Sequence, residues 1–295
     1  MKVIQAVDLF CGGGGTTEGF IMAGAEVVLA VDVWAEALKL HEANHPDVEV
    51  MEYELGKSIT LTASMIRSRL SPDAHFHLHG SPPCQALSNA SRHDAKDGMG
   101  MVKWFFRLVE YMKPDSWSME NVVPVGKHLR ELGIDYQVVN AADYGVPQAR
   151  KRVFAGEGWT LTPTHSKENH VGVIDALPHL LDEEVPDLHM DSGRSSAPSS
   201  GVNPKTGKKE GGSGFLSKSV KNPSYTIMST PKNLVDVSGQ KVKRIRSLTI
   251  EESATLQGYS DLKVPEGIRK SDQWKIVGNM VCPPVAYAII KGLHL

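Results

Sequence analysis

The chain has 295 residues, 41% of them hydrophobic and 22% charged, and its formal net charge is −2. A chain of this length can bury one large core and carry a small second lobe, and no apolar run approaches the ~18 residues that span a membrane. Its three cysteines lie far apart, which argues against a disulfide framework. Residues 1–5 show no secretory signal, so we expect a soluble intracellular protein.

Apolar and amphipathic segments alternate along the first 120 residues. Strands are expected at 3–10, 27–32, 76–80 and 117–119, with helices that open at Thr16 and that run from 35 to 44 and from 102 to 111. This alternation predicts an α/β fold with a parallel sheet, in which ligands bind beyond the carboxyl ends of the strands. Four side chains lie at or near these ends and should converge on one crevice: Asp8, Asp32, Cys84 and Glu120.

A glycine run, Gly12 to Gly15, joins the first strand to the first helix, and Asp32 ends the next strand. Glycines let the backbone approach a ligand, and a helix N-terminus favours an anionic group. The spacing is not the dinucleotide fingerprint, because Thr17 stands where its third glycine would be. A nucleoside-type cofactor without a pyrophosphate is favoured. S-adenosylmethionine fits, with its carboxylate at the loop and two ribose hydroxyls at Asp32. The alternative is a simple tight turn.

The next feature is the turn Pro82-Pro83-Cys84-Gln85. Each proline fixes its φ and removes an N–H donor, and the residue before a proline is pushed towards extended geometry. The thiol of Cys84 is therefore presented by a stiff turn, while Glu120 supplies a carboxyl group from a second strand end. A thiol nucleophile and a proton donor are what attack on an electron-poor aromatic ring requires.

Three histidines, His75, His77 and His79, share one face of the strand that leads to this turn, a spacing that metal ligands also use. No cysteine or acid completes a set, so no metal is expected and edge or core histidines are favoured. Cys11 and Cys282 lie in apolar or glycine-rich contexts and are interpreted as structural.

Gln148, Arg150 and Arg152 alternate along a later strand-like segment, which predicts that they share a face. Such a face suits a phosphate or a base edge, and a solvated strand is the alternative. Residues 201–246 carry ten basic and two acidic residues, a net +8, whereas residues 1–200 carry −10. This charge distribution indicates either a surface that binds phosphate or a solvated loop. Residues 191–214, rich in Ser, Gly, Pro and Lys, are expected to be mobile, as a linker or a loop that orders on a partner.

Six blocks of the sequence, taken in order, resemble those of the cytosine-5 DNA methyltransferase family over nearly the whole chain. They are 8–14, 80–85, 119–122, 143–152, 246–259 and 277–284. Each block is a weak motif alone, whereas six in the family's order are specific. The resemblance implies a doubly wound, mostly parallel Rossmann-like methyltransferase sheet with a small target-recognition lobe. It also implies S-adenosylmethionine as cofactor, double-stranded DNA as partner and no metal.

The resemblance implies the chemistry as well. The Cys84 thiolate would add to carbon 6 of cytosine and so activate carbon 5, which takes the methyl group. Glu120 would hydrogen-bond the ring, which requires a carboxyl of raised pKa in a closed pocket. Arg152 would hold the base, and Arg150 the backbone or the pocket wall. Because none of this can occur inside a stacked duplex, the base must be flipped out.

By the same resemblance, three blocks surround the cofactor. Phe10, Gly12 and Gly14 lie at its methionine part, Asp32 at the ribose, Val33 and Trp34 on the adenine, and Asn279 and Val281 close the pocket. Glu52 or Glu54 is the candidate acid for the adenine amino group. Nucleic-acid contacts are assigned to Gln85, Ser88, Gln148, Lys205, Lys208 and Lys209.

The expected domains are a catalytic and cofactor-binding domain, residues 1–155 and 247–295, and a small target-recognition lobe, residues 156–246. Segments 171–177 and 223–228 resemble scaffold flanks, which leaves residues 178–222 for recognition and favours a short target or relaxed specificity. The last helix, 285–291, should pack beside the first. We expect a monomer that acts in the cytoplasm, at the nucleoid.

Two other functions stay open. One branch of the family that resembles the DNA enzymes modifies tRNA and shares the Pro-Pro-Cys-Gln block and a compact lobe. This chain has no Cys-Phe-Thr tripeptide, a mark of that branch. A catalytically inactive nucleic-acid-binding homologue would have lost the chemical set, yet Cys84, Glu120, Gln148, Arg150 and Arg152 are all present. The nucleophile and acid blocks exclude a nicotinamide oxidoreductase.

Overall fold

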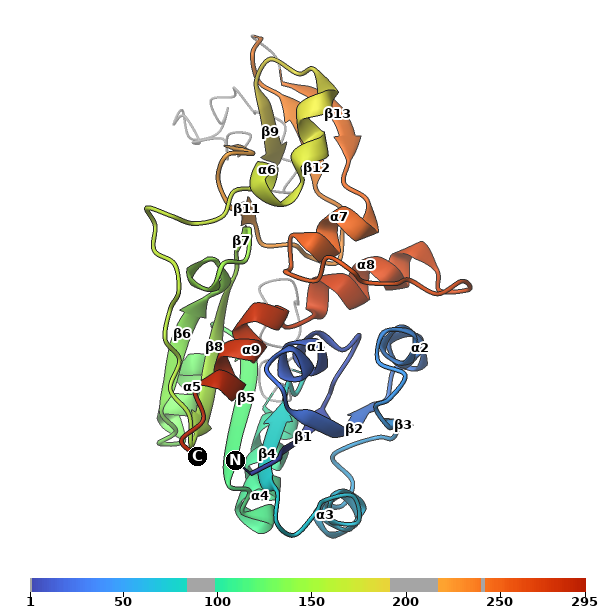
Figure 1. The fold of residues 1–295 in the computed structure, drawn as a ribbon, viewed down its shortest axis with the longest axis vertical. Helices are drawn as coiled ribbons and strands as arrows, with labels where there is room; N and C mark the ends of the chain where they lie inside the picture. The colour runs from blue at the N-terminus through green and yellow to red at the C-terminus, as the bar shows by residue number, and fades with distance from the viewer. Residues whose placement is uncertain (1, 84–98, 192–216, 240–241) are drawn as a thin grey trace, which may run out of the picture.

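A computed structural model describes residues 2–83, 99–191, 217–239 and 242–295, and its central feature is a seven-stranded sheet (Figure 1). The strand order is β3-β2-β1-β4-β5-β8-β6. The strands are β1 (Ile4–Leu9), β2 (Glu26–Asp32), β3 (Val50–Glu52), β4 (His75–Gly80), β5 (Ser116–Val122), β6 (Tyr136–Asn140) and β8 (Lys151–Glu157). β8 is antiparallel to β5 and β6, and the other neighbours are parallel. The predicted α/β fold with a mostly parallel sheet is confirmed.

Different helices cover the two faces of this sheet, because successive strand side chains point to opposite faces. Val7 and Leu9 of β1 share a core with α3 (Ile59–Arg67), α4 (Gly100–Met112) and α5 (Val125–Glu131). Ala6 points the other way, into a core with α1 (Gly15–Met22) and α9 (Pro283–Lys291). α2 (Ala35–Asn44) also packs against α8 (Lys270–Asn279). Burial on both faces explains the continuous apolar run in β2.

The C-terminal helix α9 lies beside α1, as predicted (Figure 1). A Cβ on Gly19 of α1 would stand 2.2 Å from the carbonyl oxygen of Pro283, so glycine is required for this approach. The helix begins at Pro283 rather than at the expected residue 285, because proline is well tolerated in the first turn of a helix. The segment before α9 is thereby brought back against the glycine loop.

A four-stranded antiparallel sheet with the order β10-β9-β12-β13 forms the core of a separate lobe (Figure 1). Its strands are β9 (Leu188–Asp191), β10 (Ser217–Ser219), β12 (Asn233–Asp236) and β13 (Lys243–Ser247), and they pack on α6 (Val173–Ala176) and on a 3₁₀ helix (Pro178–Glu183). A short parallel pair, β7 (Gln148–Ala149) with β11 (Ser224–Tyr225), connects the lobe to the large sheet. The predicted boundary after residue 155 falls inside β8. Segment 191–214 lies, apart from Asp191, outside the described residues.

The strands and helices expected from the sequence are present within a few residues of their predicted ends. β3, α3, α5 and β6 are not among the predicted elements. β3 has only three residues, and α3 is rich in β-branched residues, which favour strands. In the part of the chain that the structure describes, no helix is long and apolar enough to cross a bilayer.

Candidate active site

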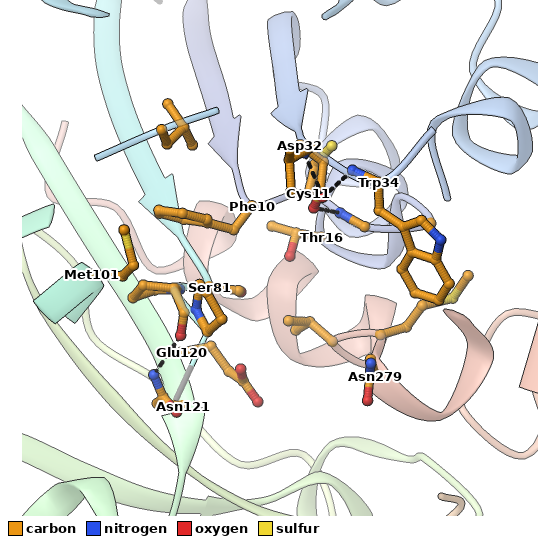
Figure 2. A pocket seen from close by; sticks show the side chains of 18 of the residues that line it. Phe10, Cys11, Thr16, Asp32, Trp34, Ser81, Met101, Glu120, Asn121 and Asn279 are labelled. Atoms are coloured by element: carbon orange, nitrogen blue, oxygen red, sulfur yellow. Dashed lines mark hydrogen bonds between the residues drawn. The ribbon is translucent and has the colours of Figure 1, made fainter. Parts of the chain in front are cut away.

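A cavity of about 620 Å³ opens at the carboxyl ends of β1, β2, β4 and β5 (Figure 2). Pockets of this size bind small ligands and cofactors. Its wall includes Asp32 and Glu120, two of the four side chains expected to converge there. Cys84 lies outside the described residues, directly after the wall residues Pro82 and Pro83.

Asp8 does not line this cavity, contrary to the prediction. Because strand side chains alternate, Asp8 points in the same direction as Ala6, towards α1, where Thr17 Oγ1 donates a hydrogen bond to it at 2.9 Å. Burial raises the pKa of Asp8 to about 7, although the hydrogen bond from Thr17 lowers it. Asp8 therefore holds the beginning of α1 against the sheet.

The first part of the glycine loop after β1 faces the cavity, and the loop then turns towards the protein interior. Gly12 and Gly14 have left-handed φ angles of 51° and 86°, which glycine adopts without cost. Gly12 and Gly13 line the cavity, whereas Gly14 faces α2, where a Cβ would stand 2.8 Å from His45. A Cβ on Gly13 would stand 2.4 Å from the Met280 methyl group. The run of glycines is thus needed to fit the loop between α2 and the C-terminal segment.

The carboxylate of Asp32 holds this loop to the segment after β2. Gly12 N donates to Oδ2 at 2.8 Å, and Val33 N and Trp34 N donate to Oδ1 at 2.7 and 3.0 Å (Figure 2). A carboxylate has about four acceptor positions, so one position, on Oδ2, remains for a ligand. The binding of two ribose hydroxyls at Asp32 stays a prediction, and in this arrangement one acceptor position is free for them.

Most of the other predicted cofactor residues line the same cavity: Phe10, Gly12, Val33, Trp34, Asn279 and Val281. Glu54 also lines it and Glu52 does not, so the geometry favours Glu54 as the acid near an adenine amino group. Gly13 and Thr16 also line the cavity and are not among the predicted cofactor residues; the available signal for them is their position at the N-terminus of α1. An acceptor on Asp32, the indole of Trp34 and a glycine loop together fit a nucleoside-type cofactor.

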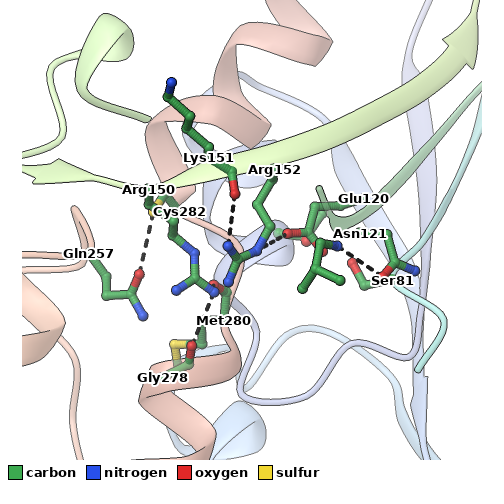
Figure 3. Close-up of polar contacts among 12 residues, drawn as sticks. Ser81, Glu120, Asn121, Arg150, Lys151, Arg152, Gln257, Gly278, Met280 and Cys282 are labelled. Carbon is green, nitrogen blue, oxygen red and sulfur yellow. Dashed lines mark hydrogen bonds and ion pairs between the residues drawn. The ribbon is translucent and has the colours of Figure 1, made fainter. Parts of the chain in front are cut away.

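Glu120 lies near the end of β5 with 8% of its surface exposed. Arg152 Nε is 3.0 Å from Glu120 Oε1 (Figure 3). Burial raises the pKa of Glu120, and the charges of Arg152 and Arg150 lower it only in part. A carboxyl with a raised pKa can share its proton with a bound ring.

Asn121 connects this acid to the proline turn. Its Nδ2 donates to the carbonyl oxygen of Pro82 at 2.9 Å, and its side chain is buried (Figure 3). The position of the turn that leads to Cys84 is therefore fixed from β5. The sequence analysis gives Asn121 no role, although its place directly after Glu120 is a signal for one.

Gln148 and Arg150 are buried where the large sheet meets the lobe. Arg150 donates to the backbone carbonyl of Ile227 at 3.0 Å. It also donates to the carbonyls of Gly278 and Met280 at 3.0 and 3.1 Å, two residues that lie beside it in Figure 3. The amide of Gln148 accepts from Ile227 N at 2.8 Å and donates to Leu256 O at 3.1 Å. The alternative of a solvated strand is therefore wrong for both residues. Arg150 forms part of the cavity wall, and the contact of Gln148 with nucleic acid stays a prediction.

The basic residues of segment 201–246 divide into exposed and internal ones where they are described. Lys221, Lys243 and Arg244 are exposed, whereas Lys232 is 1% exposed and Arg246 is paired with acids. Five of the predicted nucleic-acid contacts lie outside the described residues: Gln85, Ser88, Lys205, Lys208 and Lys209. The net charge of the segment therefore overstates the charge that the described lobe offers to a phosphate backbone.

The three histidines of β4, His75, His77 and His79, are buried core residues, and each bonds to serine hydroxyls. Among the described residues no group of His, Cys, Asp and Glu is arranged to hold a metal ion. Cys11 and Cys282 are also buried, and burial raises the pKa of both thiols, which suits structural residues.

Comparisons with known proteins identify the family of the chain. The model of the C-5 cytosine-specific DNA methylase family matches residues 4–294. The type II methyltransferase M1.HphI of Haemophilus parahaemolyticus is 31% identical, over 97% of this chain and 86% of its own length. M.HindV of Haemophilus influenzae is 27% identical, over 94% of this chain and 92% of its own.

Two solved structures share the fold. A protein described as a DNA modification methyltransferase encoded within an E. coli prophage has a TM-score of 0.64 at 21% identity and is covered over 98% of both chains. The S. pombe Dnmt2 methyltransferase has a TM-score of 0.63 at 15% identity, over 97% of this chain and 96% of its own. Residues from five of the six motif blocks line one cavity. The match of the family model over residues 4–294 means that the chain belongs to the C-5 cytosine-specific DNA methylase family.

Proposed function

We propose that this chain transfers a methyl group from S-adenosylmethionine to carbon 5 of a flipped-out cytosine in double-stranded DNA, through a covalent adduct of Cys84. The observation that carries the proposal is Glu120, a buried carboxyl of raised pKa beside Arg152 on the wall of a ligand-sized cavity. Membership of the C-5 cytosine-specific family supports the type of reaction.

The proposed role of Glu120 follows from these surroundings. Its carboxyl donates a proton to ring nitrogen 3 of the cytosine and accepts a hydrogen bond from the 4-amino group. Electron density is thus drawn from the ring as the Cys84 thiolate adds to carbon 6. Arg152 lies beside Glu120 and holds the base, while Asn121 keeps the Pro82 turn in position.

Residues of the cavity that fit the cofactor have separate roles. The free acceptor position of Asp32 takes a ribose hydroxyl, Trp34 packs on the adenine, and Glu54 accepts from its amino group. The N-terminus of α1 and the backbone of Gly12 and Gly13 receive the carboxylate of the methionine part. When bound, the cofactor supplies a methyl group on a positively charged sulfur.

The DNA must be opened before this chemistry, because the target base is unreachable in the stack. Extruding a base costs a few kcal/mol, which contacts with the phosphate backbone offset. We assign such contacts to the exposed Lys221, Lys243 and Arg244 of the lobe. We propose that a monomer acts on DNA in the cytoplasm, at the nucleoid.

The first test measures transfer of labelled methyl from S-adenosylmethionine to duplex DNA and, in parallel, to bulk tRNA. We expect label in DNA, and sequencing for 5-methylcytosine then gives the target. Label in tRNA alone would replace DNA by RNA as the substrate. Absence of label from both, with cofactor still bound, would favour an inactive nucleic-acid-binding homologue.

Replacing the proposed nucleophile tests the covalent step. Cys84→Ser should abolish methyl transfer, because a serine hydroxyl is not ionised at neutral pH, while the binding of cofactor and DNA persists. Methyl transfer and DNA binding are measured on the same preparation. Retained transfer in Cys84→Ser would overturn the covalent adduct and leave the rest of the proposal standing.

A further inference from the structure

A continuous chain of histidine and serine side chains runs through the interior between β4 and β5. His75 Nε2 and His77 Nδ1 each lie 2.8 Å from Ser116 Oγ, and His77 Nε2 is 2.9 Å from Ser118 Oγ. His79 Nδ1 is 2.7 Å from Ser118 Oγ. The register of the two strands pairs His77 with Ser116 and His79 with Ser118, so all five side chains share one face of the sheet.

The strict alternation of imidazole and hydroxyl in this chain has a chemical consequence. Burial lowers the pKa of His77, and it lowers that of His79 to about 3, so both rings are neutral at pH 7. A neutral imidazole has one donor and one acceptor nitrogen, and a hydroxyl donates once while it accepts. All the hydrogen bonds of the chain can therefore point in one direction or all in the other.

The surroundings of this hydrogen-bonded series of His and Ser side chains keep it separate from water. His77, His79, Ser116 and Ser118 are at most 1% exposed. The ring of Phe20 packs edge-on against both inner histidines, with centroid distances of 5.3 and 5.6 Å. Among the described residues, a proton that enters this series of side chains can leave it only at the two ends.

The two ends of the chain lie at different places on the molecule. At one end His79 Nε2 is 3.1 Å from Ser81 Oγ and 3.4 Å from Thr16 Oγ1, and both Ser81 and Thr16 line the cavity. At the other end His75 is 8% exposed, at the opposite ends of the strands. Asp115 and Lys2 are the charged groups that act on this outer histidine, with opposite effects on its pKa.

We propose that this His–Ser chain, His75–Ser116–His77–Ser118–His79–Ser81, is a proton relay between the active-site cavity and the solvent at His75. The proposal rests on the proposed function, since methyl transfer to carbon 5 sets free one proton in each cycle. The carbon 5–hydrogen bond breaks, its electron pair restores the ring as Cys84 leaves, and the sulfur of the cofactor becomes neutral. One proton must therefore leave the cavity.

The relay moves that proton without moving a heavy atom far. A proton arrives at His79 Nε2 through Ser81, and the proton on His79 Nδ1 passes to the oxygen of Ser118. The hydroxyl proton of Ser118 moves to His77 Nε2, and the same exchange through Ser116 reaches His75, which releases a proton to water. One proton enters and one leaves, and rotation of the hydroxyls and rings restores the first arrangement.

The test interrupts the relay at its centre with Ser118→Ala. A single turnover is followed on duplex DNA that carries tritium at cytosine carbon 5, with labelled methyl transfer measured on the same samples. Ser118→Ala should slow tritium release at least tenfold relative to methyl transfer, with the KM for DNA unchanged. Ser118→Thr, which keeps the hydroxyl, should restore the wild-type ratio. Thr62→Val, which removes a fully buried hydroxyl of α3, is the matched control and should not change it.

His75→Gln ends the relay at the most exposed of its three histidines, and it decides the matter if Ser118→Ala does not fold. It should slow tritium release in the same way. Tritium release and methyl transfer that keep the wild-type ratio in these variants would overturn the relay alone and leave the chain as a purely structural link between β4 and β5. A wild-type protein that transfers no methyl group would overturn the proposed function and the relay together.

Discussion

Two glutamate–arginine pairs of this chain, one in the cavity and one in the lobe, have opposite carboxyl pKa shifts. Glu120 meets one donor, Arg152 Nε at 3.0 Å, and burial raises its pKa. Glu252 is also buried, which raises its pKa, but hydrogen bonds from Arg246, His179 and Thr249 N outweigh this effect and bring the pKa to about 2. Burial dominates at Glu120, whereas at Glu252 several hydrogen bonds together outweigh it.

The difference separates a carboxyl that can exchange a proton from one that is permanently ionised. Glu252 closes the capping box at the start of α7 (Ile250–Thr255) and joins Arg246 of β13 to this helix. Every acceptor position of its carboxylate is used for structure. Glu120 keeps acceptor positions free in a cavity, which is the property that the proposed chemistry needs.

The largest effect that this comparison predicts is on catalysis by Glu120→Gln. The glutamine amide has the shape of the carboxyl group but has no acidic proton to donate to the ring. Methyl transfer should therefore fall about 10²- to 10⁴-fold. Single-turnover transfer to duplex DNA measures the loss. Glu251→Gln, at an exposed site, is the control and should keep wild-type transfer.

The thermal stability of Glu120→Gln provides a second test, in which no loss is expected. The native pKa of Glu120 is raised above its ordinary 4.5, so the contribution of this group to stability is full below pH 4.5 and is lost as the pH rises through the native pKa. Glu120→Gln avoids that loss and should be at least as stable as the wild type at pH 7 to 8 in thermal unfolding. A clearly lower Tm would show that Glu120 is a structural ion pair like Glu252.

The next largest effect is expected for Glu252→Gln, on the free energy of unfolding. The native pKa of about 2 is below the ordinary 4.5, so Glu252 stabilises the fold above pH 4.5, and this contribution is lost as the pH falls from 4.5 to about 2. We expect the variant to lose about 2 kcal/mol of unfolding free energy at pH 7, with partial solvent screening taken into account. Denaturant unfolding at pH 7 and pH 3 measures it, and an equal loss at both values contradicts the ionic explanation.

The smallest expected effect is a shift in pH dependence on removing the arginine partner. Arg152 lowers the pKa of Glu120, so Arg152→Gln should raise it further. If transfer needs protonated Glu120, its rate falls as the pH rises through this pKa, and in the variant the fall should move to higher pH. Lys151→Gln, whose side chain points away from Glu120 in Figure 3, is the control with the same loss of charge. If the transfer rate of Arg152→Gln falls at the same pH as that of the wild type, the charge of Arg152 does not control the protonation of Glu120 in catalysis.

The sequence predicts strands β1, β2, β4 and β5 of the large sheet and most of the cavity, because those signals are local. Asp32 and Glu120 follow apolar strands, and the carboxyl ends of parallel strands meet at one edge. Asp8 is the exception. It lies one residue before the end of β1, and alternation sends its side chain to the face that packs on α1. A strand end that is correct within one residue thus still leaves the face of a side chain undecided.

By itself, the sequence of this chain determined its family, its fold class, the glycine loop and the acid that faces the cavity, since these depend on residues close together in the chain. The tertiary structure decided what depends on distant partners. It placed Arg150 among carbonyls of residues 227, 278 and 280, and it aligned His77 and His79 with serines 39 to 41 positions away. Periodicity shows which side chains share a face, but the register of two strands fixes which side chains meet, and register is a property of the folded sheet.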